Sequence, residues 1–143
     1  QLSARFPLSS FIDNTYYLKV YGPNGFYREF KGNENDPALL IECKNEWHKS
    51  GDKRVTGNVQ LIFTNEDSVK EIEIVDNAYK NKTIVKKLKP KEETLVTWNT
   101  QKSFGWYDFS IRLKGKTEFE QRFAGHIETG KLSFSDPLMG RVL

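Results

Sequence analysis

Short runs in which apolar and polar residues alternate recur along the whole chain, and turn-forming residues separate them. Alternation with a period of two places every second side chain on the same face of an extended strand. In the run 59–64, for example, Val59, Leu61 and Phe63 share one face. Comparable runs predict further strands at 16–21, 26–30, 38–43, 71–74, 83–88, 94–98, 106–113 and 117–123.

The turn chemistry supports the same fold class. Gly22-Pro23-Asn24-Gly25 lies between two alternating runs and predicts a β-hairpin, and a second turn is expected at 65–68. The aromatic share of 13% suits pleated, half-buried surfaces, and no amphipathic helix with a capping box is found. Many short strands with short connections favour a β-sandwich or barrel. We expect an all-β protein, a β-sandwich of short, mainly antiparallel strands.

One aromatic pattern occurs twice, near the two ends of the chain. The offset is 91 residues in the first half of the pattern and 93 in the second, where a hairpin loop absorbs the difference. The two copies are Tyr16-x-Leu18-x-Val20…Phe26-x-x-x-Phe30-x-Gly32 and Tyr107-x-Phe109-x-Ile111…Phe119-x-x-x-Phe123-x-Gly125. We therefore interpret residues 1–32 as the closing hairpin of a preceding β module and 33–143 as a complete C-terminal β-sandwich module. The two parts can pack as one domain.

Charge and cysteine content exclude several classes of function. The net charge is only +3, and lysines alternate with acidic residues almost everywhere, which differs from the one-sided charge of nucleic-acid-binding proteins. The densest basic cluster, within residues 86–91, is interpreted as a solvated surface rather than an anion-binding one. Cys43 is the only cysteine and lies in the apolar run 39–43, so we expect a buried, inert thiol. No run approaches about 18 apolar residues, which excludes a transmembrane helix.

The motifs for catalysis or metal binding are missing or weak. His126-x-Glu128, together with His48 and Asp136, is a conceivable metal site, but hydrogen bonds that hold the last strand in place are the preferred interpretation. The sequence has no Gly-x-Ser-x-Gly elbow and no phosphate-binding glycine loop. The paired carboxylates at 71 and 73 and at 92 and 93 have no apolar context that would raise a pKa. We expect no catalytic, cofactor-binding or metal-binding residue in this chain.

The aromatic residues at turns are the remaining functional candidates. Phe26 and Tyr27 lie at the predicted hairpin, and Phe104 and Trp106 follow a predicted turn at 101–103. Most aromatic residues of such a chain belong in the sandwich core, but rings at loop tips beside lysines suit a lipid interface, and ring stacking on carbohydrate is the alternative. These four residues are our candidate lipid or partner contacts. The turn-rich tail 133–140 is expected to pack along the sandwich edge or against a neighbour.

Three stretches carry a family resemblance. Residues 16–32, with the pattern Tyr-x-Leu-x-Val-Tyr-Gly-Pro-Asn-Gly-Phe-x-Arg-x-Phe-x-Gly, are similar to the C-terminal region of bacterial phosphocholine-specific phospholipases C, of both non-haemolytic and haemolytic type. Gly105-Trp106-Tyr107-Asp108 and the closing stretch 123–130, followed by Ser135-Asp136-Pro137, resemble the same region in order and spacing. Residues 43–102 match only in outline.

The resemblance implies a role and a cellular location. It identifies the chain as a C-terminal accessory repeat of an exported bacterial enzyme, periplasmic or extracellular, that cleaves phosphatidylcholine to diacylglycerol and phosphocholine. None of the catalytic motifs of that family is present, so the implied role is non-catalytic. The implied partners are the catalytic domain and a choline-phospholipid surface. A free-standing lipid- or carbohydrate-binding module and a purely structural domain are the alternatives.

Overall fold

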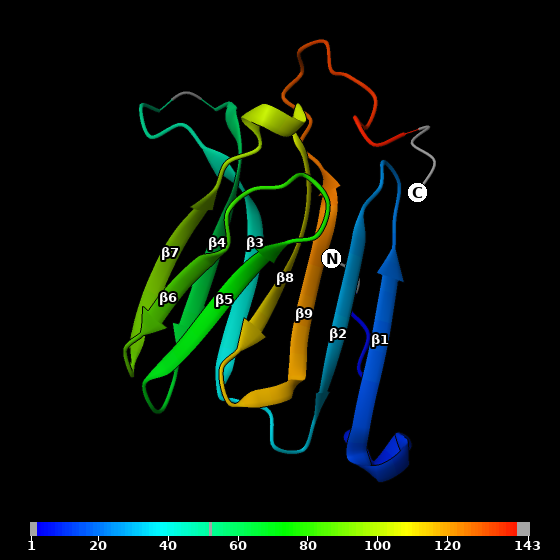
Figure 1. Cartoon of the computed structure of the whole chain (residues 1–143), viewed down its shortest axis with the longest axis vertical. Helices are drawn as coiled ribbons and strands as arrows, with labels where there is room; N and C mark the ends of the chain where they lie inside the picture. Colours follow the sequence, from blue (N-terminus) through cyan, green and yellow to red (C-terminus); the bar gives the residue numbers. More distant parts are fainter. Residues whose placement is uncertain (1–2, 52, 140–143) are drawn as a thin grey trace.

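The computed structural model describes residues 3–51 and 53–139, and it contains two antiparallel sheets that pack face to face (Figure 1). The larger sheet has the strand order β1-β2-β9-β8-β5-β6 and the smaller has the order β3-β4-β7. Nine strands lie within the described residues: β1 (Thr15–Tyr21), β2 (Tyr27–Asn33), β3 (Leu39–Trp47), β4 (Val55–Asn65), β5 (Lys70–Asp76), β6 (Ile84–Leu88), β7 (Glu92–Trp98), β8 (Trp106–Leu113) and β9 (Lys116–His126). The all-β sandwich prediction is confirmed.

The helical content of the described residues is limited to three short 3₁₀ turns. They are η1 (Leu8–Ser10) and η2 (Ile12–Asn14) before the first strand, and η3 (Gln101–Ser103) between β7 and β8. Ser103 holds η3 in place, because its hydroxyl donates to the carbonyl oxygen of Trp106 at 2.6 Å.

Alternating apolar side chains build the core between the sheets. Val59, Leu61 and Phe63 of β4 are at most 1% exposed, and they pack against the inner face of the larger sheet, including Phe109 and Ile111 of β8. Complete burial of side chains of this size stabilises the fold by roughly 1.5–3 kcal/mol each. The inward-facing residues of β4 are those that the period-two alternation of the sequence predicts.

The β1–β2 hairpin forms as predicted and is joined to the rest of the larger sheet. The amide of Gly22 donates to the carbonyl of Phe26 at 2.9 Å, and the amide of Phe26 donates to Pro23 at 3.1 Å, which closes the turn. β2 pairs with β9 from Tyr27 opposite Ala124 to Lys31 opposite Glu120. The hairpin therefore shares one continuous sheet with strands of the second predicted module. Its interpretation as the end of a preceding module stays a prediction.

The two sheets differ in width, and this leaves the hairpin poorly covered. The hydrophobic core takes residues from every strand except β1, and β2 contributes only the partly buried Phe30. β1 lies at the edge of the larger sheet, at the right of Figure 1, and the smaller sheet lies toward the other side. The outer edge of β1 is thus unpaired among the described residues, and its inner face is only partly covered, with the Phe11 ring 6.3 Å from that of Tyr16.

The sequence-based turn at 65–68 begins one residue later than expected. Asn65 is the last residue of β4 and is fully buried. Its side-chain amide donates to the carbonyl oxygens of Ser68 at 2.8 Å and Lys89 at 3.0 Å. Asn65 therefore ties the end of β4 to the β6–β7 turn.

Candidate interaction surface at the sandwich apex

Five connections meet at one end of the sandwich, which we call the apex (top of Figure 1). They are the β1–β2 turn, the β3–β4 and β5–β6 loops, the segment from β7 to β8 that contains η3, and the chain that follows β9. Large apolar side chains of the apex are exposed to solvent. The most exposed are Leu132 at 102%, Met139 at 73%, Phe134 at 64% and Phe104 at 50%.

The backbone at η3 projects Phe104 outward. Phe104 follows the 3₁₀ turn with φ of 55°, in the left-handed region, which lets the chain reverse direction into β8. The amide of Gly105 donates to the carbonyl of Thr100 at 3.1 Å and closes this reversal. The Phe104 ring contacts the Phe134 ring, with centroids 4.8 Å apart.

The chain after β9 folds back over the apex. The indole Nε1 of Trp106 donates to the carbonyl oxygen of Phe134 at 3.0 Å, and the Tyr79 hydroxyl donates to Asp136 at 3.1 Å. The Asp136 carboxylate also accepts the amide of Leu138 at 2.9 Å, which forms a turn within the tail that the sequence predicts to be turn-rich. The tail thus lies across the end of the sandwich, where its apolar side chains join those of η3.

A groove of about 420 Å³ lies between η3 and this tail. Phe104, His126, Ile127, Leu132 and Phe134 form much of its wall, and the start of β4 completes it. The groove is open and shallow compared with an enclosed ligand cavity, so it presents apolar surface rather than a closed binding pocket.

The apex is also basic. Exposed lysines lie on four of its five connections, and they are Lys49, Lys53, Lys80, Lys82, Lys102 and Lys131. Among the described residues of these connections, the acidic groups are Glu128 and Asp136, which are hydrogen-bonded to Asn24 and Tyr79, respectively. Such an arrangement suits a lipid interface, because the apolar side chains can insert below the headgroups while the lysines contact anionic or zwitterionic headgroups.

The structure brings three of the four candidate contact residues to the apex. Phe26 is 39% exposed, with the guanidinium of Arg28 4.1 Å from its ring centroid, and Phe104 is half exposed. Trp106 is partly buried and stacks at 4.5 Å on the ring of His126. A contact role for these residues stays a prediction.

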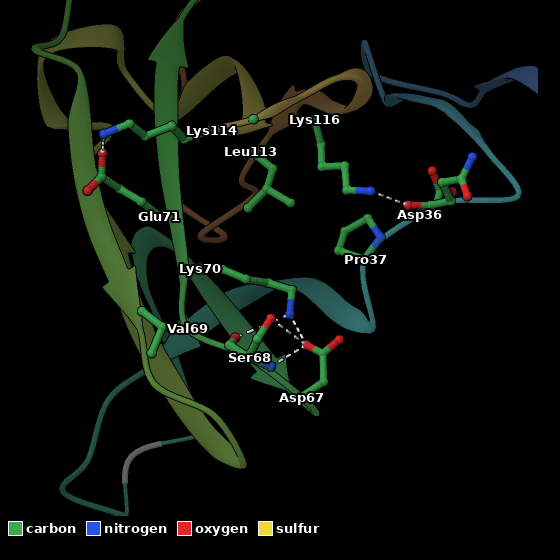
Figure 2. A pocket seen from close by; sticks show the side chains of 12 residues that line it. Asp36, Pro37, Asp67, Ser68, Val69, Lys70, Glu71, Leu113, Lys114 and Lys116 are labelled. Atoms are coloured by element: carbon green, nitrogen blue, oxygen red, sulfur yellow. Dashed lines mark hydrogen bonds and ion pairs between the residues drawn. The ribbon is translucent and has the colours of Figure 1, made fainter.

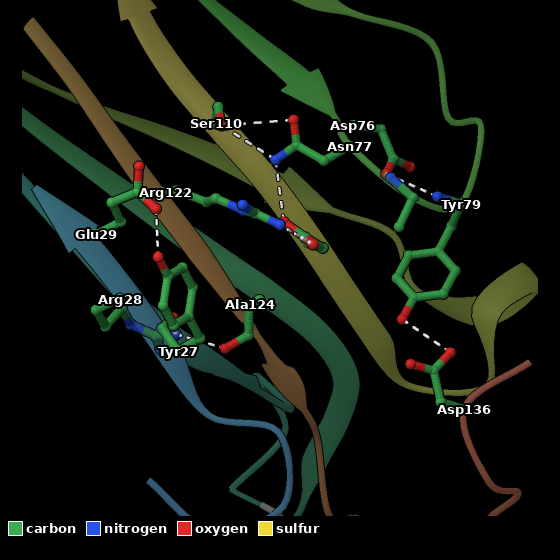
Figure 3. A network of polar contacts seen from close by, with 12 residues as sticks. Tyr27, Arg28, Glu29, Asp76, Asn77, Tyr79, Ser110, Arg122, Ala124 and Asp136 are labelled. Atoms are coloured by element: carbon green, nitrogen blue, oxygen red, sulfur yellow. Dashed lines mark hydrogen bonds and ion pairs between the residues drawn. The ribbon is translucent and has the colours of Figure 1, made fainter. Parts of the chain in front are cut away.

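The fourth candidate, Tyr27, lies on the outer face of the larger sheet in a polar network (Figure 3). Its hydroxyl donates to Glu29, and its ring lies 5.4 Å from the guanidinium of Arg122. Arg122 in turn forms a bidentate pair with Asp108, at 2.7 and 2.8 Å. These contacts place Tyr27 among polar side chains of the sheet face.

Sequence reasoning missed Leu132, Phe134 and Met139. The turn-rich character of the tail was visible, but nothing local in the sequence shows that it folds onto η3. The nearest available signal is four large apolar residues, Leu132, Phe134, Leu138 and Met139, in a turn-rich segment.

The residues of the conceivable metal site do not converge. His126 Nε2 lies 3.1 Å from the carbonyl oxygen of Phe104, Glu128 accepts from Asn24, and Asp136 accepts from Tyr79. His48 lies in the β3–β4 loop. No group of three or more potential metal ligands occurs in the described part of the chain.

The environments of Cys43 and Tyr16 keep both side chains protonated. Burial raises the pKa of the Cys43 thiol to about 11, and the nearby charge of Arg28 offsets this only partly. Cys43 packs against the core but is only partly buried, whereas its apolar sequence context predicts a buried thiol. Burial and the carboxylate of Asp36 likewise raise the pKa of Tyr16. Both groups are therefore neutral near pH 7.

A second hollow lies at the opposite end of the sandwich and is polar (Figure 2). It has a volume of about 470 Å³, and its charged groups are mostly engaged with each other. Lys70 pairs with Asp67, and Lys114 lies 3.2 Å from Glu71. This hollow therefore offers little unbalanced charge to a ligand.

No helix among residues 3–51 and 53–139 has the length and apolar character needed to cross a bilayer.

Known proteins match nearly the whole chain. A non-hemolytic phospholipase C of Burkholderia pseudomallei is 38% identical over 125 residues, which are 87% of this chain and 18% of that protein. A non-hemolytic phospholipase C of Pseudomonas aeruginosa is 36% identical over 135 residues, with the same two shares. A hemolytic phospholipase C of the same organism is 34% identical over 128 residues, 17% of its length. The chain thus spans less than a fifth of the length of these relatives.

The family described as bacterial phospholipase C, C-terminal domain, matches in two segments, residues 1–33 and 38–126. These segments include all the strands of both sheets. The chain belongs to the family of bacterial phospholipase C C-terminal domains.

Proposed function

We propose that this chain is the non-catalytic accessory module of an exported bacterial phospholipase C that hydrolyses phosphatidylcholine, and that its apex helps the enzyme engage the lipid interface. The relatives named phospholipase C and the match to their C-terminal region support the first part. The catalytic domain of the same polypeptide is then its intramolecular partner.

The observation that carries the interfacial role is the exposure of Phe104, Leu132 and Phe134 within one basic surface. Exposed apolar patches of this kind mark interaction sites, because their contact with water is unfavourable. Transfer of each side chain into a lipid headgroup region would recover roughly 1–3 kcal/mol. The surrounding lysines would add attraction to anionic lipid that weakens with salt.

Vesicle co-sedimentation tests this role. The purified chain is mixed with phosphatidylcholine vesicles, with and without an anionic lipid, at about 0.05 M and 0.5 M salt. We expect binding to both kinds of vesicle, with a salt-sensitive increase on the anionic ones. Binding that depends only on anionic lipid and disappears at high salt would instead assign the attraction to the lysines alone.

A matched pair of double variants separates the apex from apolar surface in general. Leu132→Ser with Phe134→Ser should lower partitioning into phosphatidylcholine vesicles at least about tenfold. The control, Val85→Ser with Leu95→Ser, removes apolar side chains that are also more than half exposed, from β6 and β7 away from the apex, and should leave partitioning unchanged. If the wild-type chain does not bind, or both variants lose binding equally, the apex role is wrong and docking on the catalytic domain becomes the better account. Binding to immobilised polysaccharide but not to vesicles would favour the carbohydrate alternative.

A further inference from the structure

The turn between β1 and β2, at the apex in Figure 1, contains the one Asn-Gly pair of the sequence, Asn24-Gly25. Both residues are exposed, and both have a positive φ, 54° at Asn24 and 71° at Gly25. Tight hairpin turns that need two left-handed residues favour asparagine followed by glycine. The turn thus presents an asparagine side chain to solvent beside a residue that has no side chain of its own.

The backbone nitrogen of Gly25 has no hydrogen-bonding partner. The amides of Gly22 and Phe26 close the turn by donating to the carbonyl oxygens of Phe26 and Pro23. No group among the described residues accepts a hydrogen bond from the amide of Gly25. Because glycine lacks a Cβ atom, another group can approach its backbone closely. The nitrogen is therefore available to react with the neighbouring side chain.

One hydrogen bond within the described part of the chain holds the side chain of Asn24. Its Nδ2 donates to the carboxylate of Glu128, in the segment that follows β9. Both residues are exposed, so water competes with this hydrogen bond and it opens readily. Gly25 packs beside it on Trp106, because a Cβ atom on the glycine would lie 2.9 Å from the indole ring. These two contacts join the hairpin turn to the rest of the apex.

We propose that Asn24 is a site of spontaneous deamidation, which replaces the attraction between Asn24 and Glu128 by repulsion and weakens the attraction of the apex to anionic lipid. The effect on lipid binding rests on the proposed function of the apex. The reaction itself rests on the structure of the turn alone.

The reaction needs only water. The backbone nitrogen of Gly25 attacks the side-chain carbonyl carbon, Cγ, of Asn24, so that an N–Cγ bond forms. The Cγ–Nδ2 bond breaks, and Nδ2 leaves as ammonia with the proton that the Gly25 nitrogen gives up. Water then opens the cyclic imide at one of its carbonyl carbons. Opening at Cγ yields aspartate, and opening at the backbone carbonyl yields isoaspartate, in which the main chain runs through the side-chain carbon atoms.

Both products place a negative charge where the amide of Asn24 was. Neither carboxylate can donate to Glu128, and the two like charges repel each other. Isoaspartate also lengthens the main chain, which alters the turn that holds Gly25 against Trp106. The net charge of the basic apex falls by one unit, so its attraction to anionic lipid weakens.

Peptide mapping by mass spectrometry tests the site. The 143-residue chain is incubated in mildly alkaline buffer, and conversion of each asparagine to aspartate or isoaspartate is followed over time. Asn24 should convert at least about tenfold faster than Asn35 and Asn99, which are also exposed but precede residues with side chains. Equal rates at the three positions would overturn the proposal. Conversion of Asn24 to aspartate without isoaspartate would also overturn it, because direct hydrolysis of the amide yields aspartate alone.

A pair of variants tests the effect on lipid binding. Asn24→Asp should weaken binding to anionic vesicles about fivefold at low salt and less at high salt. The matched control, Asn35→Asp, adds the same charge at the opposite end of the sandwich and should change binding less than about twofold. Equal effects of the two variants would contradict the claim that position 24 controls the charge of the binding surface.

Thermal unfolding tests the repulsion from Glu128. Asn24→Asp should lower the melting temperature by about 2 °C or more, because a hydrogen bond is exchanged for a like-charge contact. In a Glu128→Gln background the same substitution should have less than about half of this effect, since the neutral amide can donate to the new carboxylate. Equal effects in the two backgrounds would show that no repulsive contact forms.

Failure of this inference can be distinguished from failure of the lipid-binding role. If the chain does not bind vesicles but Asn24 converts through the imide, the interfacial role is wrong and the modification site stands. If the chain binds vesicles but Asn24 converts no faster than Asn35 and Asn99, the modification site is wrong and the interfacial role stands. Mapping and vesicle co-sedimentation of the same preparation, before and after incubation, give both results.

Discussion

At the scale of single residues, Asn65 is the polar side chain on which the packing of one end of the sandwich depends. It is fully buried, its amide group donates to backbone carbonyls of the turns on either side, and its side-chain oxygen accepts a hydrogen bond from Lys70 at 2.9 Å. The ammonium of Lys70 is itself nearly buried and also pairs with Asp67. A buried charge of this kind is tolerated only when hydrogen bonds surround it.

Asn65→Ala should therefore destabilise the fold by about 2 kcal/mol, because it leaves buried carbonyl groups without a donor and removes one of the hydrogen bonds around the nearly buried Lys70 ammonium. The midpoint of urea denaturation, followed by tryptophan fluorescence, measures this loss. Asn45→Ala, at an exposed position of β3, is the matched control and should change stability by less than about 0.5 kcal/mol. Similar losses in the two variants would show that the hydrogen bonds of Asn65 add little.

The role of Asn65 lay beyond sequence reasoning for a physical reason. The partners of its amide include Leu88 and Lys89, more than 20 residues away, and no local pattern encodes that contact. Val59, Leu61 and Phe63, by contrast, were predicted correctly because alternation along one strand is a local property.

At the scale of the elements, Glu46 links the three strands of the smaller sheet. From β3 its carboxylate accepts hydrogen bonds from Thr56 at 2.7 Å and Asn58 at 3.1 Å on β4, and from Thr97 at 3.1 Å on β7. The pKa of Glu46 lies below its ordinary value of 4.5, mainly because Thr56 donates a hydrogen bond to the carboxylate. Partial burial acts in the opposite direction and raises the pKa.

Because the pKa of Glu46 is lowered in the folded state, its contribution to stability is complete above 4.5 and is lost as pH falls below that value. Glu46→Gln removes this titration. The stability difference between wild type and Glu46→Gln should therefore be larger at about pH 7 than at about pH 3.5, as measured by urea denaturation at both pH values. Other acidic groups titrate equally in both proteins and cancel in the comparison. A difference that does not change with pH would contradict the assignment.

The positions of single strands could be predicted from the sequence, whereas contacts between distant segments could not. The positions of the strands were predicted to within a few residues, because each strand has its own alternation and turn signals. The contact between the Phe104 and Phe134 rings was not predicted, because it depends on how the tail crosses the apex. Of the candidate contacts, Phe26, Phe104 and Trp106 reach the apex, while Tyr27 is drawn into the ion-pair network of the sheet face.

At the scale of the whole molecule, the fold exposes apolar side chains at its apex, and no group of three or more potential metal ligands occurs among the described residues. The purified chain is expected to hydrolyse neither phosphatidylcholine nor a chromogenic phosphocholine ester, because its thiol and its buried tyrosine hydroxyls are neutral near pH 7. The assay compares the chain with a full-length phospholipase C of the family as positive control, with and without added zinc or calcium. Turnover above the protein-free blank that persists through repeated purification would refute this expectation.

The unequal sizes of the two sheets, six strands and three, were not predicted. The sequence repeat is nevertheless related to this inequality, because both of its hairpins belong to the larger sheet. The repeat identified two similar hairpins, but only the pairing of β2 with β9 shows that they join edge to edge. Which sheet edge receives another strand depends on long-range packing, and alternation within a strand carries no information about it.

Within the sequence repeat Glu29 corresponds to Arg122, and these two residues face each other in the β2–β9 ladder, so the joint between the two similar hairpins is symmetric. This symmetry limits how many such hairpins can join in one sheet. A joint that uses the same strand edge from both participants is consumed once two copies have met. Head-to-tail repeats, by contrast, always leave an unused end and can be extended without limit. Duplication of a hairpin that joins in this way should therefore stop at a closed pair, and a third copy would need a different mode of attachment.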